Sequence, residues 1–168
     1  MQPLWAPWRM ELIERKPPPG CIFCLLPAET GSEGDRRNLI LARTGRSFAL
    51  LNRYPYNNAH LMVVPRRHTA EFASLSSEES QDLHALLQLA TDVLKQAYRP
   101  EGMNLGMNLG HCAGAGIPDH LHWHVVPRWQ GDTNFMPVLG QGKVMIEHLQ
   151  SSYDKLQPLF RERLPRGG

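Results

Sequence analysis

The order of apolar and polar residues divides the chain into short strand-like runs and one long helical stretch. Five mostly apolar runs are bounded by glycine, proline or asparagine, which is typical of short strands. They cover residues 38–42, 47–51, 60–64, 103–109 and 120–126. After the third run the apolar period changes to three and four residues, which predicts an amphipathic helix from Ser76. Ser76 and Glu79 have the spacing of a capping box, and Pro100 with Gly102 ends the helical pattern.

The two ends of the chain carry weaker patterns. Residues 1–37 are predicted to form an irregular arm, with consecutive prolines at 17–19 and a polar loop at 29–35. Residues 140–168 are predicted to form a helical tail, although Pro158 weakens its helical pattern. The whole chain, residues 1–168, is therefore expected to be one α+β domain: an antiparallel sheet of about five strands with a long helix and a C-terminal helix packed on it.

Composition narrows the possible partners. Lysine and arginine number 18 against 16 aspartate and glutamate, a net charge of +2, so there is no broad basic field for nucleic acid. No apolar run approaches the roughly 18 residues that span a bilayer. Prolines near the amino terminus do not fit a signal peptide. We expect a cytoplasmic protein with neither a membrane nor a nucleic acid as its partner.

Histidine is unusually frequent, with eight residues against three cysteines. His120, His122 and His124 alternate with apolar residues in the fifth predicted strand. Because successive side chains of a strand point to opposite faces, the three imidazoles should lie in a row on one face. Such a row indicates a functional site more strongly than a single histidine does.

A glycine-rich loop at 108–118 directly precedes this row. Around Gly114, Ala115 and Gly116 the backbone N–H groups could approach an anion closely, as in phosphate-binding nests. A flexible connection between two strands is the alternative interpretation.

Cys21 and Cys24 are separated by two residues, a spacing suited to metal or redox chemistry rather than to a secreted disulfide framework. Two cysteines are half of a zinc site, and a reduced thiol pair without metal is the alternative.

The His-x-His-x-His pattern with apolar residues between the histidines resembles the histidine triad (HIT) family. The resemblance covers about residues 21–129 and includes the segments 47–52 and 59–65. The segments 5–9 and 127–135 look like the bacterial branch of diadenosine tetraphosphate phosphorylases and hydrolases. The resemblance implies a HIT-like fold.

The resemblance also implies an activity: nucleotidyl transfer through a covalent nucleotidyl-histidine, which replaces one difficult displacement by two easier steps. His122 would be the nucleophile, and His124 would hold phosphate oxygens and assist the leaving group. His120 and His60 would complete the site. Dinucleoside polyphosphates such as diadenosine tetraphosphate, or related nucleotide conjugates, would be the substrates, with water or phosphate as the final acceptor.

Nucleotide contacts follow from the same resemblance. Asn52 would meet the ribose hydroxyls and Asn108 a phosphate or bridging oxygen, and Trp129 would also contact the nucleotide. The loop residues Gly114, Ala115 and Gly116 would bind phosphate. Many family members carry serine, threonine or glutamine in this loop, whereas this chain does not. The leaving-group proton donor therefore stays open, with His111 as one alternative.

The resemblance further implies a structural zinc ion, held by Cys21, Cys24, His68 and His120, no organic cofactor, and a homodimer. Two other functions compete with the enzyme. One is a nucleotide-binding or scaffold protein of the same fold with little or no turnover. The other is a catalytic metal centre in a barrel, which needs about 250 residues and is therefore disfavoured.

Overall fold

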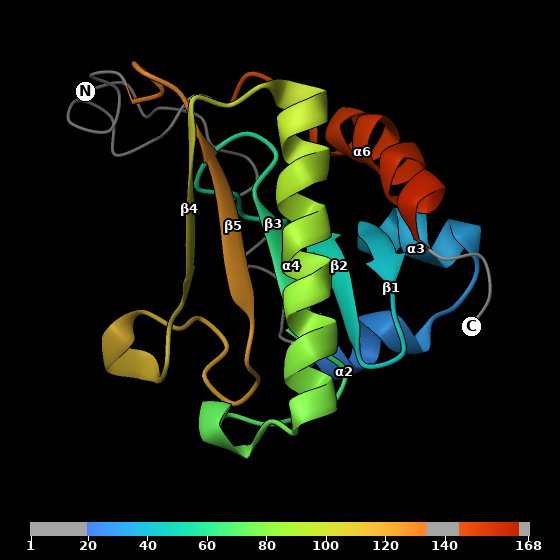
Figure 1. Cartoon of the computed structure of the whole chain (residues 1–168), viewed down its shortest axis with the longest axis vertical. Coiled ribbons are helices and arrows are strands. Elements are labelled where there is room, and N and C mark those ends of the chain that lie inside the picture. Colours follow the sequence, from blue (N-terminus) through green and yellow to red (C-terminus); the bar gives the residue numbers. More distant parts are fainter. Residues whose placement is uncertain (1–19, 134–144, 165–168) are drawn as a thin grey trace, which may run out of the picture.

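The computed structural model describes residues 20–133 and 145–164. Within them a five-stranded antiparallel sheet has the strand order β1-β2-β3-β5-β4 (Figure 1). The strands are β1 Ile40–Arg43, β2 Ser47–Leu51, β3 Leu61–Pro65, β4 Gly102–Met107 and β5 Trp123–Arg128. The α+β prediction is confirmed. Residues 1–19, 134–144 and 165–168 lie outside the described residues; they include parts of the expected arm, of the expected tail and of the 5–9 and 127–135 segments.

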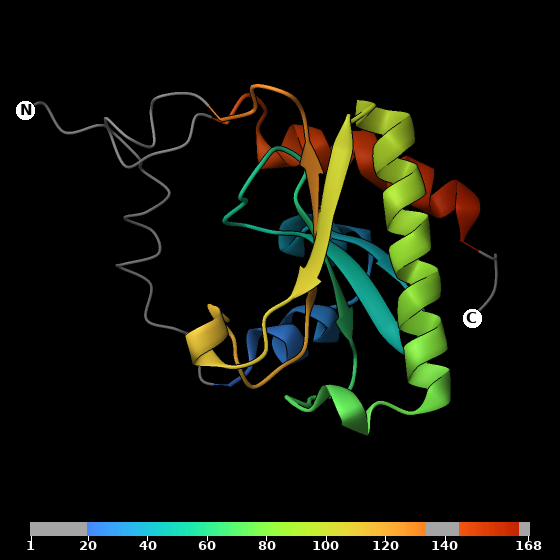
Figure 2. The same cartoon turned by 60° about the vertical axis from the view of Figure 1, so that its left-hand side comes forward.

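Two helices, α4 (Ser77–Tyr98) and α6 (Leu149–Arg163), cover one face of the sheet (Figures 1 and 2). Their apolar sides enclose the larger core with inward residues of the strands, such as Val63 and Val125. The predicted capping box is present, since Ser76 accepts from the Glu79 backbone and Glu79 accepts from the Ser76 backbone. None of the helices in the described ranges is long and apolar enough to cross a membrane.

The opposite face of the sheet carries a smaller apolar cluster. Phe23, from the short helix α2 (Ile22–Leu25), packs there with β2 and β3 residues such as Phe48 and Met62. The remaining short elements are η1 Leu26–Ala28, α3 Ser32–Asn38, η2 Phe72–Ser74 and η3 His111–Ala113.

The prediction of an irregular arm is wrong for the part that the structure describes, because residues 20–38 contain the helices α2 and α3. Tertiary contacts explain the difference. The Arg43 guanidinium donates to the Pro27 carbonyl oxygen at 2.7 Å and to an Asp35 carboxylate oxygen at 2.6 Å. Gly34 also lies so close to Glu29 that a Cβ on it would be 2.9 Å from the Glu29 Cγ. These contacts fold a segment whose polar composition suggested a loop.

The fifth strand begins at Trp123, not at residue 120 as predicted. The Leu121 N–H donates to the Thr69 carbonyl oxygen at 2.8 Å, so the chain bonds to the segment after β3 before it joins the ladder. At the other end of the chain, the tail helix forms despite Pro158. Burial of Tyr153, Leu156 and Phe160 against the core accompanies it.

Candidate active site

The triad histidines, His120, His122 and His124, remain close neighbours although only His124 belongs to β5. His124 pairs in register with Met62, which places it on the face of the smaller apolar cluster. The His122 and His124 ring centres are 4.9 Å apart. Phe23 packs on both earlier rings, with its centre 5.5 Å from His120 and 5.0 Å from His122. The prediction of one shared histidine face therefore agrees with these contacts.

The orientation of His122 is fixed by a backbone group. Its Nδ1 lies 2.9 Å from the His120 carbonyl oxygen, and a carbonyl can only accept. Nδ1 therefore carries the proton and Nε2 keeps its lone pair. Burial lowers the pKa of His122, which favours the neutral ring. His122 thus has the protonation that a nitrogen nucleophile requires.

His60 and His124 form a second ordered pair. The Tyr56 backbone N–H donates to His60 Nδ1 at 3.0 Å, and a backbone amide can only donate. The His60 proton therefore sits on Nε2, which is 3.0 Å from His124 Nδ1. His124 in turn accepts at Nδ1 and carries its own proton on Nε2.

Electrostatics keeps both of these rings neutral. Burial, followed by the neighbouring His124 and His122, lowers the pKa of His60 to about 3. Burial and His122 lower the pKa of His124 to about 4. At neutral pH the site therefore combines one imidazole with a free lone pair, His122, and one with an available N–H, His124.

Asn52 lies next to the hydrogen-bonded pair of His60 and His124. Its Oδ1 accepts from the Tyr54 backbone N–H at 2.9 Å, and its Nδ2 lies 3.3 Å from His60 Nδ1. The structure thus gives Asn52 a positioning contact with His60, and its ribose contact stays a prediction.

Two backbone N–H groups of the glycine-rich loop that were expected to bind phosphate form hydrogen bonds within the loop instead. The Gly114 N–H donates to the His111 carbonyl oxygen at 2.9 Å, and the Ala115 N–H donates to the Gly110 carbonyl oxygen at 3.3 Å. Gly114 has a φ of 89° and lies against the Asn108 amide, which is 3.7 Å from where a Cβ would stand. Within residues 20–133 and 145–164, the Gly116 N–H and the Asn108 side chain form no hydrogen bond.

Trp129 lies outside this arrangement. It follows the carboxyl end of β5, five residues beyond His124, and its backbone N–H donates to an Asp132 carboxylate oxygen at 3.2 Å. In the described part of the chain its ring contacts no triad histidine. The sequence hypothesis missed two aromatic neighbours of the site, Phe23 and Tyr56. The position of Tyr56 four residues before His60 was the available signal.

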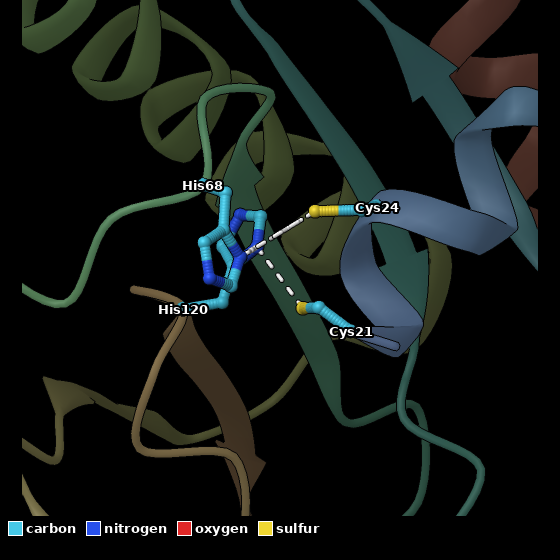
Figure 3. Close-up of side chains that lie close together, drawn as sticks. All are labelled: Cys21, Cys24, His68 and His120. Carbon is cyan, nitrogen blue, oxygen red and sulfur yellow. Dashed lines mark hydrogen bonds between the residues drawn. The ribbon is translucent and has the colours of Figure 1, made fainter. Parts of the chain in front are cut away.

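Four side chains predicted as metal ligands converge at the other end of the histidine row (Figure 3). Cys24 lies in α2 and Cys21 directly precedes it, while His68 follows β3 and His120 precedes β5. Their ligand atoms all lie within 4.8 Å of one another.

The donor atoms of this group suit a zinc ion. His120 Nε2 donates to the Pro65 carbonyl oxygen at 2.8 Å, so Nδ1 is left with a lone pair. That Nδ1 faces Cys21 Sγ at 3.3 Å and His68 Nδ1 at 3.3 Å. Two sulfur and two nitrogen donors at this spacing fit tetrahedral zinc.

Comparisons with known proteins agree with this geometry. The HIT domain model matches residues 33–131. The AP-4-A phosphorylase of Mycobacterium tuberculosis is 41% identical over an alignment of 161 residues, which covers 90% of this chain and 80% of that protein.

Two solved structures share the fold. A histidine triad nucleotide-binding protein from Sulfolobus tokodaii is 26% identical with a TM-score of 0.62, covering 84% of this chain and 90% of that one. A Zn-bound histidine triad protein from Mycobacterium smegmatis is 20% identical with a TM-score of 0.64, covering 84% and 94%. The chain belongs to the HIT domain family.

Proposed function

We propose that this chain is an enzyme that cleaves dinucleoside polyphosphates of the diadenosine tetraphosphate type. The observation that carries the proposal is the complementary protonation of His122 and His124, one with a lone pair and the other with an N–H. The similarity to an AP-4-A phosphorylase over most of both chains supports this substrate class.

The reaction takes two steps. His122 Nε2 attacks the α-phosphorus, forming an N–P bond while the P–O bond to the leaving nucleotide breaks. The oxygen departs with the electron pair of that bond as a phosphate oxyanion, and the His124 Nε2–H donates a hydrogen bond to it, while His60 donates to the other nitrogen of the His124 ring. In the second step an oxygen of the acceptor, phosphate or water, forms a new P–O bond, the N–P bond breaks with its electron pair returning to His122 Nε2, and the surplus proton of the acceptor passes to solvent. The similarity to a phosphorylase favours phosphate as the acceptor.

Substrate contacts complete the proposal. Asn52 would hold the ribose, while Asn108 and the Gly116 N–H would hold phosphate oxygens, because both groups are free of hydrogen bonds within the described ranges. Gly114 and Ala115 would shape the loop rather than donate to the ligand, and Trp129 would contact a more distant part of the substrate.

Zinc would be structural here, held by Cys21, Cys24, His68 and His120. A bound ion would cross-link the α2 segment to the part of the chain that precedes His122. Thiols that bind metal must stay reduced, which favours a cytoplasmic location.

A homodimer is also proposed, with β4 as the contact. β4 is an edge strand of the sheet, and its Leu105 side chain is 46% exposed. An edge of this kind can pair with the same strand of a second copy.

Product analysis tests the function. The purified protein is incubated with diadenosine tetraphosphate, with and without inorganic phosphate. ADP and ATP formed only with phosphate indicate phosphorolysis, whereas AMP and ATP indicate hydrolysis. No mononucleotide under either condition would contradict the substrate class.

Substitution of the nucleophile tests the mechanism. His122→Ala should abolish turnover and retain nucleotide binding, whereas His148→Ala, which changes an exposed histidine before α6, is the matched control. Turnover by His122→Ala at the wild-type rate would reject His122 as the nucleophile.

A further inference from the structure

Tyr56 lies over His124, the imidazole that faces the leaving group, and over His60, which is hydrogen-bonded to it. Its ring centre is 4.7 Å from that of His60 and 5.5 Å from that of His124. The side chain is nevertheless 56% exposed. Phe23 also packs on triad rings, but it is 2% exposed and belongs to the core. Tyr56 therefore combines contact with His124 and an open aromatic surface.

The contacts of Tyr56 within the protein do not explain why an aromatic ring stands there. Its backbone N–H, not its side chain, fixes the protonation of His60. In residues 20–133 and 145–164 its hydroxyl forms no hydrogen bond. An exposed apolar ring gains little from folding alone, so a ligand that covers it offers the missing stabilisation.

We propose that Tyr56 is a specificity-determining residue whose exposed ring stacks on the base of the leaving nucleotide. The inference rests on the proposed function. His124 presents its N–H to the departing oxygen, so the leaving nucleotide extends from the His124 side of the site, where Tyr56 lies. Every base has a π face, so stacking selects substrates with a second nucleoside without selecting the base itself.

Two substrates that differ only in the second nucleoside isolate this role. Diadenosine tetraphosphate and adenosine 5′-tetraphosphate both present an AMP group to His122, but the second leaves as triphosphate without a base. Tyr56→Leu keeps an apolar side chain over His60 and removes the π face, whereas Tyr56→Phe keeps the ring. The readout is the ratio of kcat/KM between the two substrates.

The Tyr56→Leu variant should lower that ratio about tenfold, mainly through KM, because base stacking acts on bound substrate before and during reaction. Tyr56→Phe should retain the wild-type ratio. An equal loss on both substrates, or no loss on either, would overturn the role. Calorimetric binding of both nucleotides to the same variants tests the stacking separately. If the wild type turned over neither substrate, the proposed function would fail, while a selective loss of dinucleotide binding in Tyr56→Leu would still support the stacking.

Discussion

Acidification should destabilise the fold through His60. This side chain is fully buried, and its pKa falls from the ordinary 6.5 to about 3 because burial disfavours the charged ring. Between these two values the unfolded chain binds a proton at this position and the native chain does not. The free energy of unfolding therefore rises with pH across this window, and it falls as the solution is acidified below 6.5.

The size of the effect follows from the two pKa values. At pH 5 the unfolded histidine lies 1.5 units below its ordinary pKa of 6.5, while native His60 stays neutral. Each unit corresponds to about 1.4 kcal/mol, so His60 alone should cost roughly 2 kcal/mol of stability between pH 8 and pH 5. This is a large fraction of the ~5–15 kcal/mol that stabilises a typical domain.

Urea unfolding of the wild type and of His60→Asn at pH 8 and pH 5 measures this contribution. Asparagine does not titrate, and its Oδ1 can still accept from the Tyr56 N–H. The other ionisable groups are common to both chains, so the difference between the two pH dependences reports the titration of His60 together with its coupling to His124. The wild type should lose about 2 kcal/mol more than the variant on acidification. Parallel pH dependences would refute the inference that burial keeps His60 neutral.

Two further predictions concern the helix cap and the metal group. Ser76→Ala removes the capping contact to the Glu79 backbone and should lower the free energy of unfolding in urea by about 1 kcal/mol. Ser77→Ala, at the next exposed position, is the control. Equal losses of stability in the two variants would contradict the role of Ser76 as a cap. Chelation should lower the melting temperature of the zinc-loaded wild type and leave that of Cys21→Ala unchanged, because a missing thiolate prevents four-coordinate closure. A wild-type melting curve that a strong chelator does not move would argue against a structural zinc ion.

The elements that could be predicted from the sequence are those with a local periodic signal. Strand β2 has the predicted bounds, and α4 begins directly after the predicted cap. The helices of the segment 20–38 have no such signal, because contacts with residues outside the segment accompany them: Phe23 of α2 packs on β2 and β3, and Arg43 bonds to Asp35 of α3. The late start of β5 likewise depends on a bond from Leu121 to Thr69 that periodicity does not reveal.

The candidate active site also has features that could be predicted from the sequence and features that could not. The spacing of the histidines and of the cysteine pair pointed to residues that converge, whereas His68 at the metal group came from the resemblance to the HIT family. The protonation of each ring was not accessible, because it depends on backbone groups such as the Tyr56 N–H and the Pro65 carbonyl. The loop amides were assigned to phosphate, whereas the fold uses two of them within the loop.

His120 links the metal group to the nucleophile through a single residue. Its Nδ1 faces the cysteines, its Nε2 donates to Pro65, and its carbonyl oxygen accepts from His122 Nδ1. Three contacts on one residue leave it little freedom, so the His122 ring is held in one orientation before any substrate arrives. Ordering the ring during folding removes that entropic cost from the reaction itself. The alternation of the triad therefore does more than gather three imidazoles: its first member orients the second through the backbone.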